Sequence, residues 1–258
     1  MKISPVLGAV VGDIIGSAYE FNFTKEYDFD LFHPKAHFTD DTVLTMSVAI
    51  SILEQSAYEK NLLNFYLNYQ GCMYGPGFLR WVNTNQTQDS FGNGAPMRIS
   101  PVASLFHTSA EVLEESKKAV EMTHGHAEGI KGAQAIAMAI HLANNQKSKQ
   151  EIKDYLVATF GYHLDFQLND IREKNTFDAT SQVTVPQALN CFFESTDFES
   201  AIRLAVSLGG DSDTLASMTG GIAAAFYQHI PKEMIDFCIA KLPQEFVDIL
   251  NRVQSKAS

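Results

Sequence analysis

Two short acidic clusters, far apart in the sequence, contain the residue types best suited to chemistry. The first is Thr39-Asp40-Asp41 and the second is Gly209-Gly210-Asp211-Ser212-Asp213-Thr214. Carboxylates that lie close together raise one another's pKa unless cations or hydrogen-bond donors compensate their charges. Two divalent cations would cancel the charges of the four aspartates. The pattern therefore predicts a site for two metal ions.

The ligand types indicate which metals would fit. Carboxylates together with the hydroxyls of Thr39 and Thr214 form an oxygen-only set, which favours Mg²⁺, Mn²⁺ or Ca²⁺ over zinc. An EF-hand fits poorly because Leu215 takes the place of a ligand and no glutamate closes the loop. The aspartyl-phosphatase pattern DxDx[TV] also fails at Leu215.

Each cluster precedes a predicted helix, so a structural interpretation stays open beside the metal site. Thr39 or Asp40 is then an N-cap, and Asp41 offsets the helix dipole. Asp211 and Asp213 are two residues apart and would point to nearly opposite sides of a helix. They share a ligand only if they are held in a turn, and the preceding glycines permit one.

A glycine-rich segment, residues 89–98 with the sequence DSFGNGAPMR, is the second candidate. Such a loop can turn backbone N–H groups toward a phosphate, while Ser90 adds a donor and Phe91 offers a ring face to a base. The alternative is a simple Asn-Gly turn in which Phe91 anchors the core.

Two further groups have weaker patterns. The pair His124 and His126, in Thr-His-Gly-His, could hydrogen-bond a phosphate or a sugar hydroxyl or bind a transition metal, but no HExxH spacing supports zinc. Glu20 ends the first helical segment, where a carboxylate could serve acid or base chemistry or could simply be solvated.

These residues must be positioned by helices. Alternating, strand-like runs are nearly absent, so we expect an all-α fold, with shorter turns after Pro231. Apolar residues recur at helical spacing over about 5–18, 42–57, 59–69, 101–107, 110–122, 128–145, 149–160, 185–194, 197–208 and 213–228.

Capping boxes are predicted at Thr108, Ser148 and Thr196, each followed three residues later by a glutamate. The irregular stretches 22–40, 71–100 and 161–182 are long, and loops of that length inside a compact domain are usually functional.

Composition sets outer limits on the function. The chain has 258 residues with no linker or repeat, which predicts one domain over residues 1–258, and we expect a monomer. Its 19 basic and 30 acidic residues give a net charge of −11, which argues against a basic nucleic-acid-binding surface. The three cysteines form no CxxC pair, and neither a signal peptide nor a membrane-spanning stretch is evident. A cytoplasmic protein fits best.

Five ordered motifs, taken together, resemble the ADP-ribosylglycohydrolases. They are GAVVGDIIGSAYE, FTDDT, SFGNGAPMR, THGH and LGGDSDT, and they span nearly the whole chain. The resemblance implies an all-α fold with two Mg²⁺ or Mn²⁺ ions in a central cleft. Two departures from the family pattern stand out: Gly125 lies between the two histidines, and Phe91 lacks the hydroxyl of a tyrosine.

The resemblance also implies roles for single residues. Phe91 would stack near adenine, His124 would contact the phosphate-ribose region, and Glu20 would lie on a flap over the metals. The implied metal ligands are Thr39, Asp40, Asp41, Asp211, Asp213 and Thr214. The implied ADP-ribose contacts are Ser90, Phe91, Gly92, Asn93, Gly94, Met97 and His124, and the implied catalytic carboxylates are Glu20, Asp40, Asp211 and Asp213.

The reaction implied by the resemblance is hydrolysis at C1″ of the distal ribose, which releases ADP-ribose from a protein, a nucleic acid or a small molecule. Two other functions remain open: a non-catalytic ADP-ribose binder, and a dinuclear phosphohydrolase acting on nucleotides. The motifs are common to several linkages and do not specify the leaving group. Residues 71–88 and 161–182 are the candidates for the acceptor side.

Overall fold

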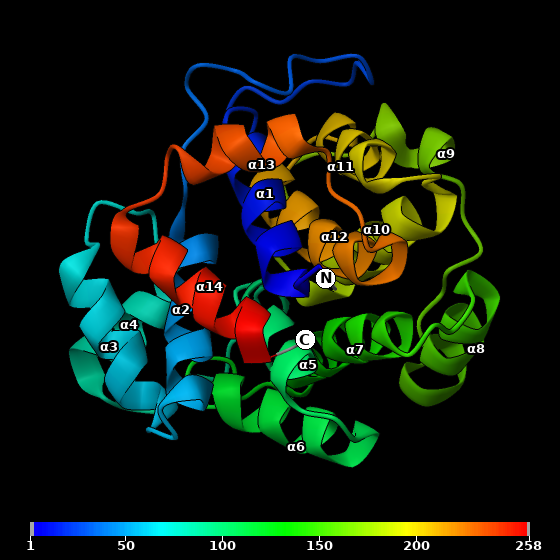
Figure 1. The fold of residues 1–258 in the computed structure, drawn as a ribbon. Coiled ribbons are helices and arrows are strands. Elements are labelled where there is room, and N and C mark those ends of the chain that lie inside the picture. The colour runs from blue at the N-terminus through cyan, green and yellow to red at the C-terminus, as the bar shows by residue number, and fades with distance from the viewer. Residues whose placement is uncertain (1–2, 257–258) are drawn as a thin grey trace.

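The computed structural model describes residues 3–256. Met1 and Lys2, part of the N-terminal stretch that was searched for a signal peptide, lie outside the described residues. Within that range the regular elements are helices, as predicted, and the only β feature is an isolated antiparallel bridge between Gly92 and Thr180. Figure 1 shows their arrangement in one compact helical domain. The elements are α1 (Pro5–Ser17), α2 (Asp40–Leu53), α3 (Tyr58–Asn68), α4 (Pro76–Thr84), η1 (Pro96–Arg98), α5 (Ser100–Leu105), α6 (Ser109–Val120), α7 (Ala127–Asn144), α8 (Lys149–Phe160), α9 (Leu168–Arg172), α10 (Ser181–Glu194), α11 (Phe198–Ser207), α12 (Ser212–Tyr227), α13 (Lys232–Ile239) and α14 (Gln244–Lys256).

The antiparallel helices α1 and α12 pack backbone against backbone. α1 has a glycine at every fourth position, and a Cβ atom on Gly12 would lie only 2.0 Å from the carbonyl oxygen of Ala216. A Cβ on Gly16 would lie 2.5 Å from the Cα of Asp213. A side chain at either glycine would therefore force the helices apart. This packing sets the first turn of α12, with its aspartate, against the last turn of α1.

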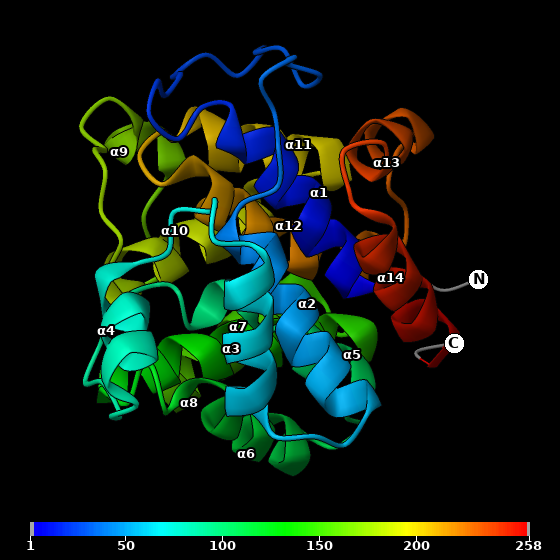
Figure 2. The same cartoon turned by 90° about the vertical axis from the view of Figure 1, so that its left-hand side faces the viewer.

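The other elements surround this pair. α7, α10 and α11 pack against α12, and α2 packs against α1, α3 and α5. The chain between α1 and α2 forms a long loop at one end of the molecule, seen in blue in Figures 1 and 2. The N-terminal ends of α2 and α12 are close enough for Thr214 and Asp41 to share a hydrogen bond.

The structure differs from the sequence prediction mainly in short elements. α4 and α9 lie inside stretches predicted to be irregular, and η1 is also new. α9 has only five residues, too few to show helical periodicity. After Pro231 the chain forms two helices, α13 and α14, rather than short turns.

The predicted capping boxes can be compared with the observed helix starts. Those at Thr108 and Ser148 are confirmed. The prediction at Thr196 is wrong by one residue, because Asp197 is the N-cap of α11 and forms the box with Ser200. Aspartate accepts the N3 amide as well as threonine does, so the sequence offered both choices.

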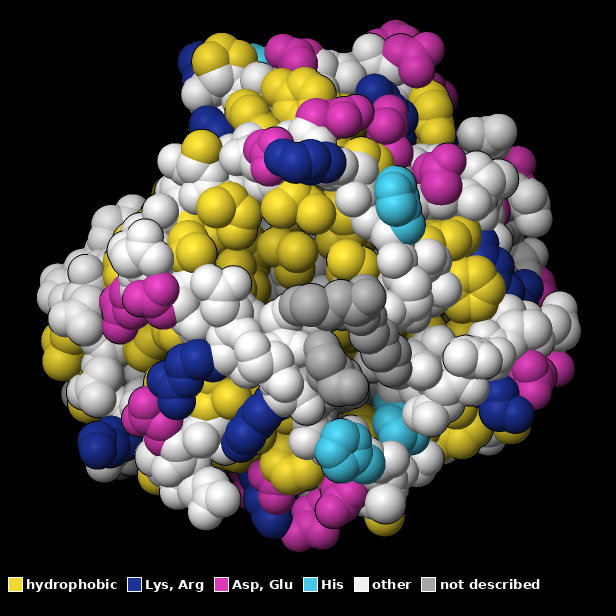
Figure 3. All heavy atoms as spheres, viewed as in Figure 1, with side chains coloured by type: hydrophobic (Ala, Val, Ile, Leu, Met, Phe, Trp, Pro, Cys, Tyr) yellow, Lys and Arg dark blue, Asp and Glu magenta, His cyan; other side chains and the backbone are white. Residues whose placement is uncertain are grey.

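Two surface properties bear on the expected partners. No helix within residues 3–256 is long and apolar enough to cross a membrane. Figure 3 shows the face that is turned toward the viewer in Figure 1, and on it acidic and basic side chains are interspersed. The described residues on that face form no single-sign basic surface of the kind that follows a nucleic-acid backbone.

Candidate active site

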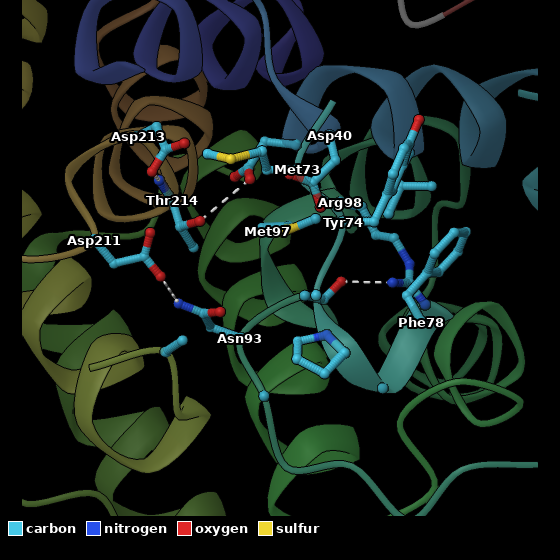
Figure 4. Close-up of a pocket in the computed structure, with 18 of the residues that line it drawn as sticks. Asp40, Met73, Tyr74, Phe78, Asn93, Met97, Arg98, Asp211, Asp213 and Thr214 are labelled. Carbon is cyan, nitrogen blue, oxygen red and sulfur yellow. Dashed lines mark hydrogen bonds between the residues drawn. The ribbon is translucent and has the colours of Figure 1, made fainter. Parts of the chain in front are cut away.

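A cavity of about 360 Å³ lies where the α2 and α12 N-terminal ends meet the glycine-rich loop. Figure 4 shows the side chains that converge on it. Thr39 and Phe91 are the predicted residues that do not line it. Those that do are Glu20, Asp40, Asp41, Ser90, Gly92, Asn93, Gly94, Met97, His124, Asp211, Asp213 and Thr214.

On the α2 side, a buried carboxylate from α1 holds the helix start. Asp13 is 0% exposed and accepts four hydrogen bonds, from the backbone amides and the hydroxyls of Thr39 and Thr42. The Thr39 hydroxyl in turn accepts the Asp41 amide at 3.2 Å, so Thr39 is the N-cap of α2. The N-cap interpretation is confirmed, and it still leaves the carboxylates of Asp40 and Asp41 facing the cavity.

Asp13 is a site residue that the sequence argument missed. Its signal was a single charged side chain in the otherwise apolar helix of residues 5–17. A carboxylate that is fully buried in such a helix needs several donors, because burial without them is costly. That rule points to Asp13, although it does not show which residues supply the donors.

On the α12 side, a glycine turn arranges the aspartates. Gly209 and Gly210 have φ of 73° and 85°, a conformation that favours glycine. The turn leaves Asp211 outside the helix as its N-cap, while Asp213 lies in the first turn. The carboxylates of Asp211, Asp213 and Glu20 therefore come within 4.8 Å of one another.

Hydrogen bonds fix two of these carboxylates and join the two sides. The Asn93 side-chain amide donates to Asp211 Oδ2 at 2.6 Å, and the Thr214 backbone amide donates to Asp213 Oδ1 at 2.8 Å. The Thr214 hydroxyl donates to Asp41 Oδ2 at 3.2 Å. The two clusters, joined by a hydrogen bond between residues 173 positions apart in sequence, thus form one site (Figure 4).

The electrostatics of the site indicate a cation. Burial raises the pKa of Asp40, Asp41 and Asp213 well above the usual range, and neighbouring carboxylates raise it further. Burial, with the charges of Asp211 and Asp13, raises the pKa of Glu20 to about 7. None of the ion pairs formed by residues 3–256 includes these groups.

Asp41 supplies a second sign of a cation. Its Oδ1 atom is buried and has no hydrogen-bond partner among the described residues. An orphaned carboxylate oxygen inside a cluster of carboxylates costs free energy unless a cation binds it. The donor set is oxygen-only and compact, so it fits divalent cations such as Mg²⁺ or Mn²⁺.

The glycine-rich loop is tied to the segment that leads into α10. Gly92 pairs with Thr180 in the isolated bridge, and the Asn93 amide donates to the Ala179 carbonyl at 2.8 Å. The Gly92 amide donates to Ser90 Oγ at 3.2 Å. Two of the loop's amides are therefore used within the protein. The amide of Gly94 has no acceptor among the described residues and stays available to a ligand.

The structure separates the two histidines. His124 is buried and lines the cavity, whereas His126 is the N-cap of α7 and accepts the Glu128 amide at 3.1 Å. The Phe91 ring is 45% exposed and lies edge-on to His126, with 5.4 Å between ring centroids. The alternative in which Phe91 anchors the core is therefore wrong.

Both stretches proposed for the acceptor side reach the cavity. Tyr74 and Phe78 form one wall, and Phe177 contributes from the second stretch. The Phe177 side chain is 53% exposed, so it lies at the mouth. Trp81 is buried behind the wall, 5.5 Å from Phe78 between ring centroids, and has a packing role.

Comparison with known proteins identifies the family of the chain. The family described as ADP-ribosylglycohydrolase matches residues 5–256. The chain belongs to this family. Its members hydrolyse glycosyl bonds, and the five motifs noted above all fall inside the matched range.

Curated relatives extend over most of the chain at low identity. Human ADP-ribosylhydrolase ARH3 is 23% identical, covering 90% of this chain and 87% of its own length. ADP-ribosylarginine hydrolase Tri1 of Pseudomonas putida is 26% identical, covering 94% and 76%. A solved structure titled "ADP-ribosylglycohydrolase-related protein complex" has a TM-score of 0.75 over 99% of this chain and 97% of its own, at 22% identity. That likeness shows that the fold is shared.

Proposed function

We propose that this protein is a divalent-metal-dependent hydrolase that cleaves the C1″ bond of ADP-ribosylated substrates and releases ADP-ribose. The observation that carries the proposal is the convergence of five carboxylates, one with an orphaned buried oxygen, on a cavity bordered by a glycine-rich loop. The names of the two curated relatives reported above, both ADP-ribosylhydrolases, support the substrate class.

Four aspartates and two threonines would hold the cations. They are Thr39, Asp40, Asp41, Asp211, Asp213 and Thr214. Asp13 accepts the Thr39 hydroxyl and so holds the start of α2 in place. Bound Mg²⁺ or Mn²⁺ ions would supply water activation and charge stabilisation. The carboxylates themselves would stabilise the positive charge that develops on the ribose as its bond to the leaving group weakens.

The ADP-ribose would extend from the carboxylates along the glycine-rich loop. Ser90, Gly94 and His124 offer hydrogen-bond donors to the diphosphate, and Met97 contributes to the wall. Gly92 and Asn93 shape the loop through their own hydrogen bonds. Phe91 lies outside the lining, so we place its contact with adenine at the outer edge of the cavity.

The reaction consumes one water. Its oxygen bonds to C1″, the bond from C1″ to the leaving atom breaks, one water proton passes to a protein carboxylate, and the leaving group receives a proton. Glu20 is our candidate for proton transfer, because its carboxylate lies beside Asp211 and Asp213 at the end of a loop. The substrate would be an ADP-ribosylated protein, nucleic acid or small molecule.

Product analysis tests the proposal. Protein freed of metal by a chelator is incubated with ADP-ribosylated arginine, serine and nucleic-acid substrates, with and without added Mn²⁺ or Mg²⁺. We expect metal-dependent release of intact ADP-ribose from at least one substrate, because cleavage at C1″ leaves the diphosphate whole. Asp40→Ala should abolish release, while the exposed control Asp154→Asn should retain it.

Three outcomes would overturn the proposal. AMP as the product would indicate a phosphohydrolase. Binding of ADP-ribose with no release from any conjugate would indicate a non-catalytic binder. Full activity in a folded Asp40→Ala variant would show that the carboxylate cluster is not the active site.

A further inference from the structure

The glycine-rich segment ends in a buried arginine, Arg98, that has no carboxylate partner in an ion pair among the described residues. Arg98 is 0% exposed, and none of the ion pairs within residues 3–256 includes it. Its guanidinium donates to the Gly94 carbonyl and to the Thr123 hydroxyl, both at 2.6 Å. Burying a cation without an ion-pair partner costs free energy, and these two hydrogen bonds offset part of that cost.

The direction of the hydrogen bond between Thr123 and His124 follows from counting donors and acceptors. Arginine has no acceptor, so Thr123 Oγ1 must accept from Arg98. The hydroxyl proton has two acceptors in reach, the Val120 carbonyl at 3.2 Å and His124 Nδ1 at 2.8 Å. The Val120 carbonyl already accepts the amides of Thr123 and His124, which use both of its lone pairs. The hydroxyl therefore donates to His124 Nδ1.

The same contacts define the chemical state of His124. Burial lowers the pKa of His124 well below its usual range, and the charge of Arg98 lowers it further, so the ring is neutral at physiological pH. A neutral imidazole whose Nδ1 accepts a hydrogen bond carries its proton on Nε2.

Nε2 faces the glycine-rich loop. A Cβ atom on Gly94 would lie 3.0 Å from His124 Nε2, and one on Gly92 would lie 3.5 Å from it. Because both residues are glycines and carry no Cβ atom, there is room beside Nε2. No described residue accepts its proton, and the ring lines the cavity. The donor is therefore directed at the space that a ligand would occupy.

We propose that Arg98 and Thr123 are positioning residues that fix His124 as an Nε2–H donor to an anionic oxygen of the ligand. The inference rests on the proposed function for the identity of that ligand, the diphosphate of ADP-ribose. Arg98 also donates to the Gly94 carbonyl and so fixes this part of the loop. The Gly94 amide, which has no acceptor among the described residues, is a second donor on the same loop. Both groups are hydrogen-bond donors, and the oxygens of a phosphate are acceptors, so the two donors suit a phosphate.

Thr123→Val tests the proposal, because it removes the hydroxyl and keeps the side-chain volume. Nitrogen-15 NMR of the histidine rings reports the tautomer, with His124 assigned by its absence in His124→Gln. Calorimetry at saturating Mn²⁺ reports the affinity for ADP-ribose. We expect Thr123→Val to lose the dominant Nε2–H tautomer and to bind ADP-ribose about tenfold more weakly, as for one lost hydrogen bond to an anion.

Two variants separate positioning from general damage. Thr123→Ser keeps the hydroxyl and should restore both the tautomer and the affinity. Thr219→Val removes an equally buried hydroxyl that donates only to the Ala188 carbonyl, and it should change neither. Mn²⁺ affinity should stay unchanged in all three variants.

The proposal is overturned if wild-type His124 carries its proton on Nδ1. It is also overturned if Thr123→Val keeps wild-type affinity, or if Thr219→Val weakens binding as much. Failure of wild-type protein to bind ADP-ribose would contradict the proposed function instead, since the NMR measurement on free protein does not depend on it.

Discussion

On the α2 side of the site a buried carboxylate holds the helix start that carries both aspartates. On the α12 side Asp213 is placed by the packing of α12 against α1, whereas loops hold Asp211. Asp13 belongs to α1 and bonds only to the first turn of α2, so helix packing fixes Asp40 and Asp41. Asp211 instead follows a glycine turn and depends on the side chain of Asn93, itself in a loop.

Lys25 ties the loop of residues 18–39 to the α12 side of the site. Its ammonium donates to the backbone carbonyls of Arg172, Asn175 and Leu208 at 2.6 to 2.8 Å. Leu208 directly precedes the glycine turn, and Lys25 belongs to the same loop as Glu20 (Figures 1 and 2). Loops open at lower free energy than packed helices. We therefore call the α2 side, with Asp40 and Asp41, the fixed half of the site, and the α12 side, where loops hold Asp211, the adjustable half.

Removing one carboxylate from either half should have the largest effect. Asp41→Asn and Asp211→Asn each keep the side-chain shape and remove a charged ligand. We expect turnover to fall by roughly a thousandfold or more in both, since metal ions supply several kcal/mol to such reactions. Rates of ADP-ribose release measure this. A large loss in only one variant would mean that the two halves are not equally needed.

Gly12→Ala should disrupt both halves together. The added Cβ would meet the Ala216 carbonyl oxygen at 2.0 Å, and the helices α1 and α12 cannot separate without moving Asp13 and Asp213. We expect the free energy of unfolding in denaturant to fall by about 3 kcal/mol or more. Gly71→Ala is the control, because its Cβ would meet nothing within 4 Å. Equal stability of the two variants would contradict the packing described.

Asp13→Asn tests the fixed half alone. The amide cannot accept all four hydrogen bonds from Thr39 and Thr42, so the start of α2 should loosen. We expect Mn²⁺ affinity to fall by about 10- to 100-fold, as for other residues that orient metal ligands. Calorimetric titration measures the affinity. Unchanged affinity in Asp13→Asn would show that the α2 side does not depend on this buried carboxylate.

The charge shared by both halves predicts a pH-dependent response to metal removal. The pKa values of Asp40, Asp41 and Asp213 are raised in the folded protein, and that of Glu20 is raised to about 7. Their contribution to stability is therefore fully present below the ordinary aspartate value of 3.8 and is lost as the pH rises through the folded pKa values.

Metal ions should offset that loss. We expect the difference in unfolding free energy between Mn²⁺-loaded and chelator-treated protein to grow by about 1 kcal/mol from about pH 5 to about pH 8, after allowance for the exposure of Glu20. Denaturant unfolding across this range measures it. A difference that shrinks as the pH rises would contradict the raised pKa values.

Lys25→Met should have the smallest effect and act on the adjustable half alone. It keeps most of the side-chain length but removes the three hydrogen bonds that hold the loop. We expect faster hydrogen exchange over residues 18–39 and about a threefold rise in KM, with Mn²⁺ affinity unchanged. Lys35→Met, at an exposed position of the same loop, is the control. Equal exchange in both variants would show that Lys25 does not hold the loop of residues 18–39.

The sequence predicted the contiguous parts of the site. The aspartates, the glycine-rich loop and His124 could be read because each motif is local and its residue types are chemically specific. Residue types alone could not reveal partners brought together by the fold. Asp13 bonds to residues 26 and 29 positions away, and Lys25 to carbonyls 147 to 183 positions away.

For the fold, too, local patterns in the sequence were the predictable part. Long helices with steady apolar periodicity, such as α7, were predicted within a residue or two, whereas the five-residue α9 carried too little pattern to be seen. The role of His126 also needed coordinates, because its sequence context suggested a ligand contact and the structure shows an N-cap. The sequence indicated which local motifs could carry chemistry, but it did not show how distant residues position them.

The number of divalent ions bound, measured together with turnover, tests the central claim most directly. Chelator-treated protein is titrated with Mn²⁺ by electron paramagnetic resonance while ADP-ribose release is followed on the same samples. We expect two ions per chain, release that appears only as they bind, and loss of at least one ion in Asp41→Asn and in Asp211→Asn. Full release of ADP-ribose by protein that holds no divalent ion would contradict it.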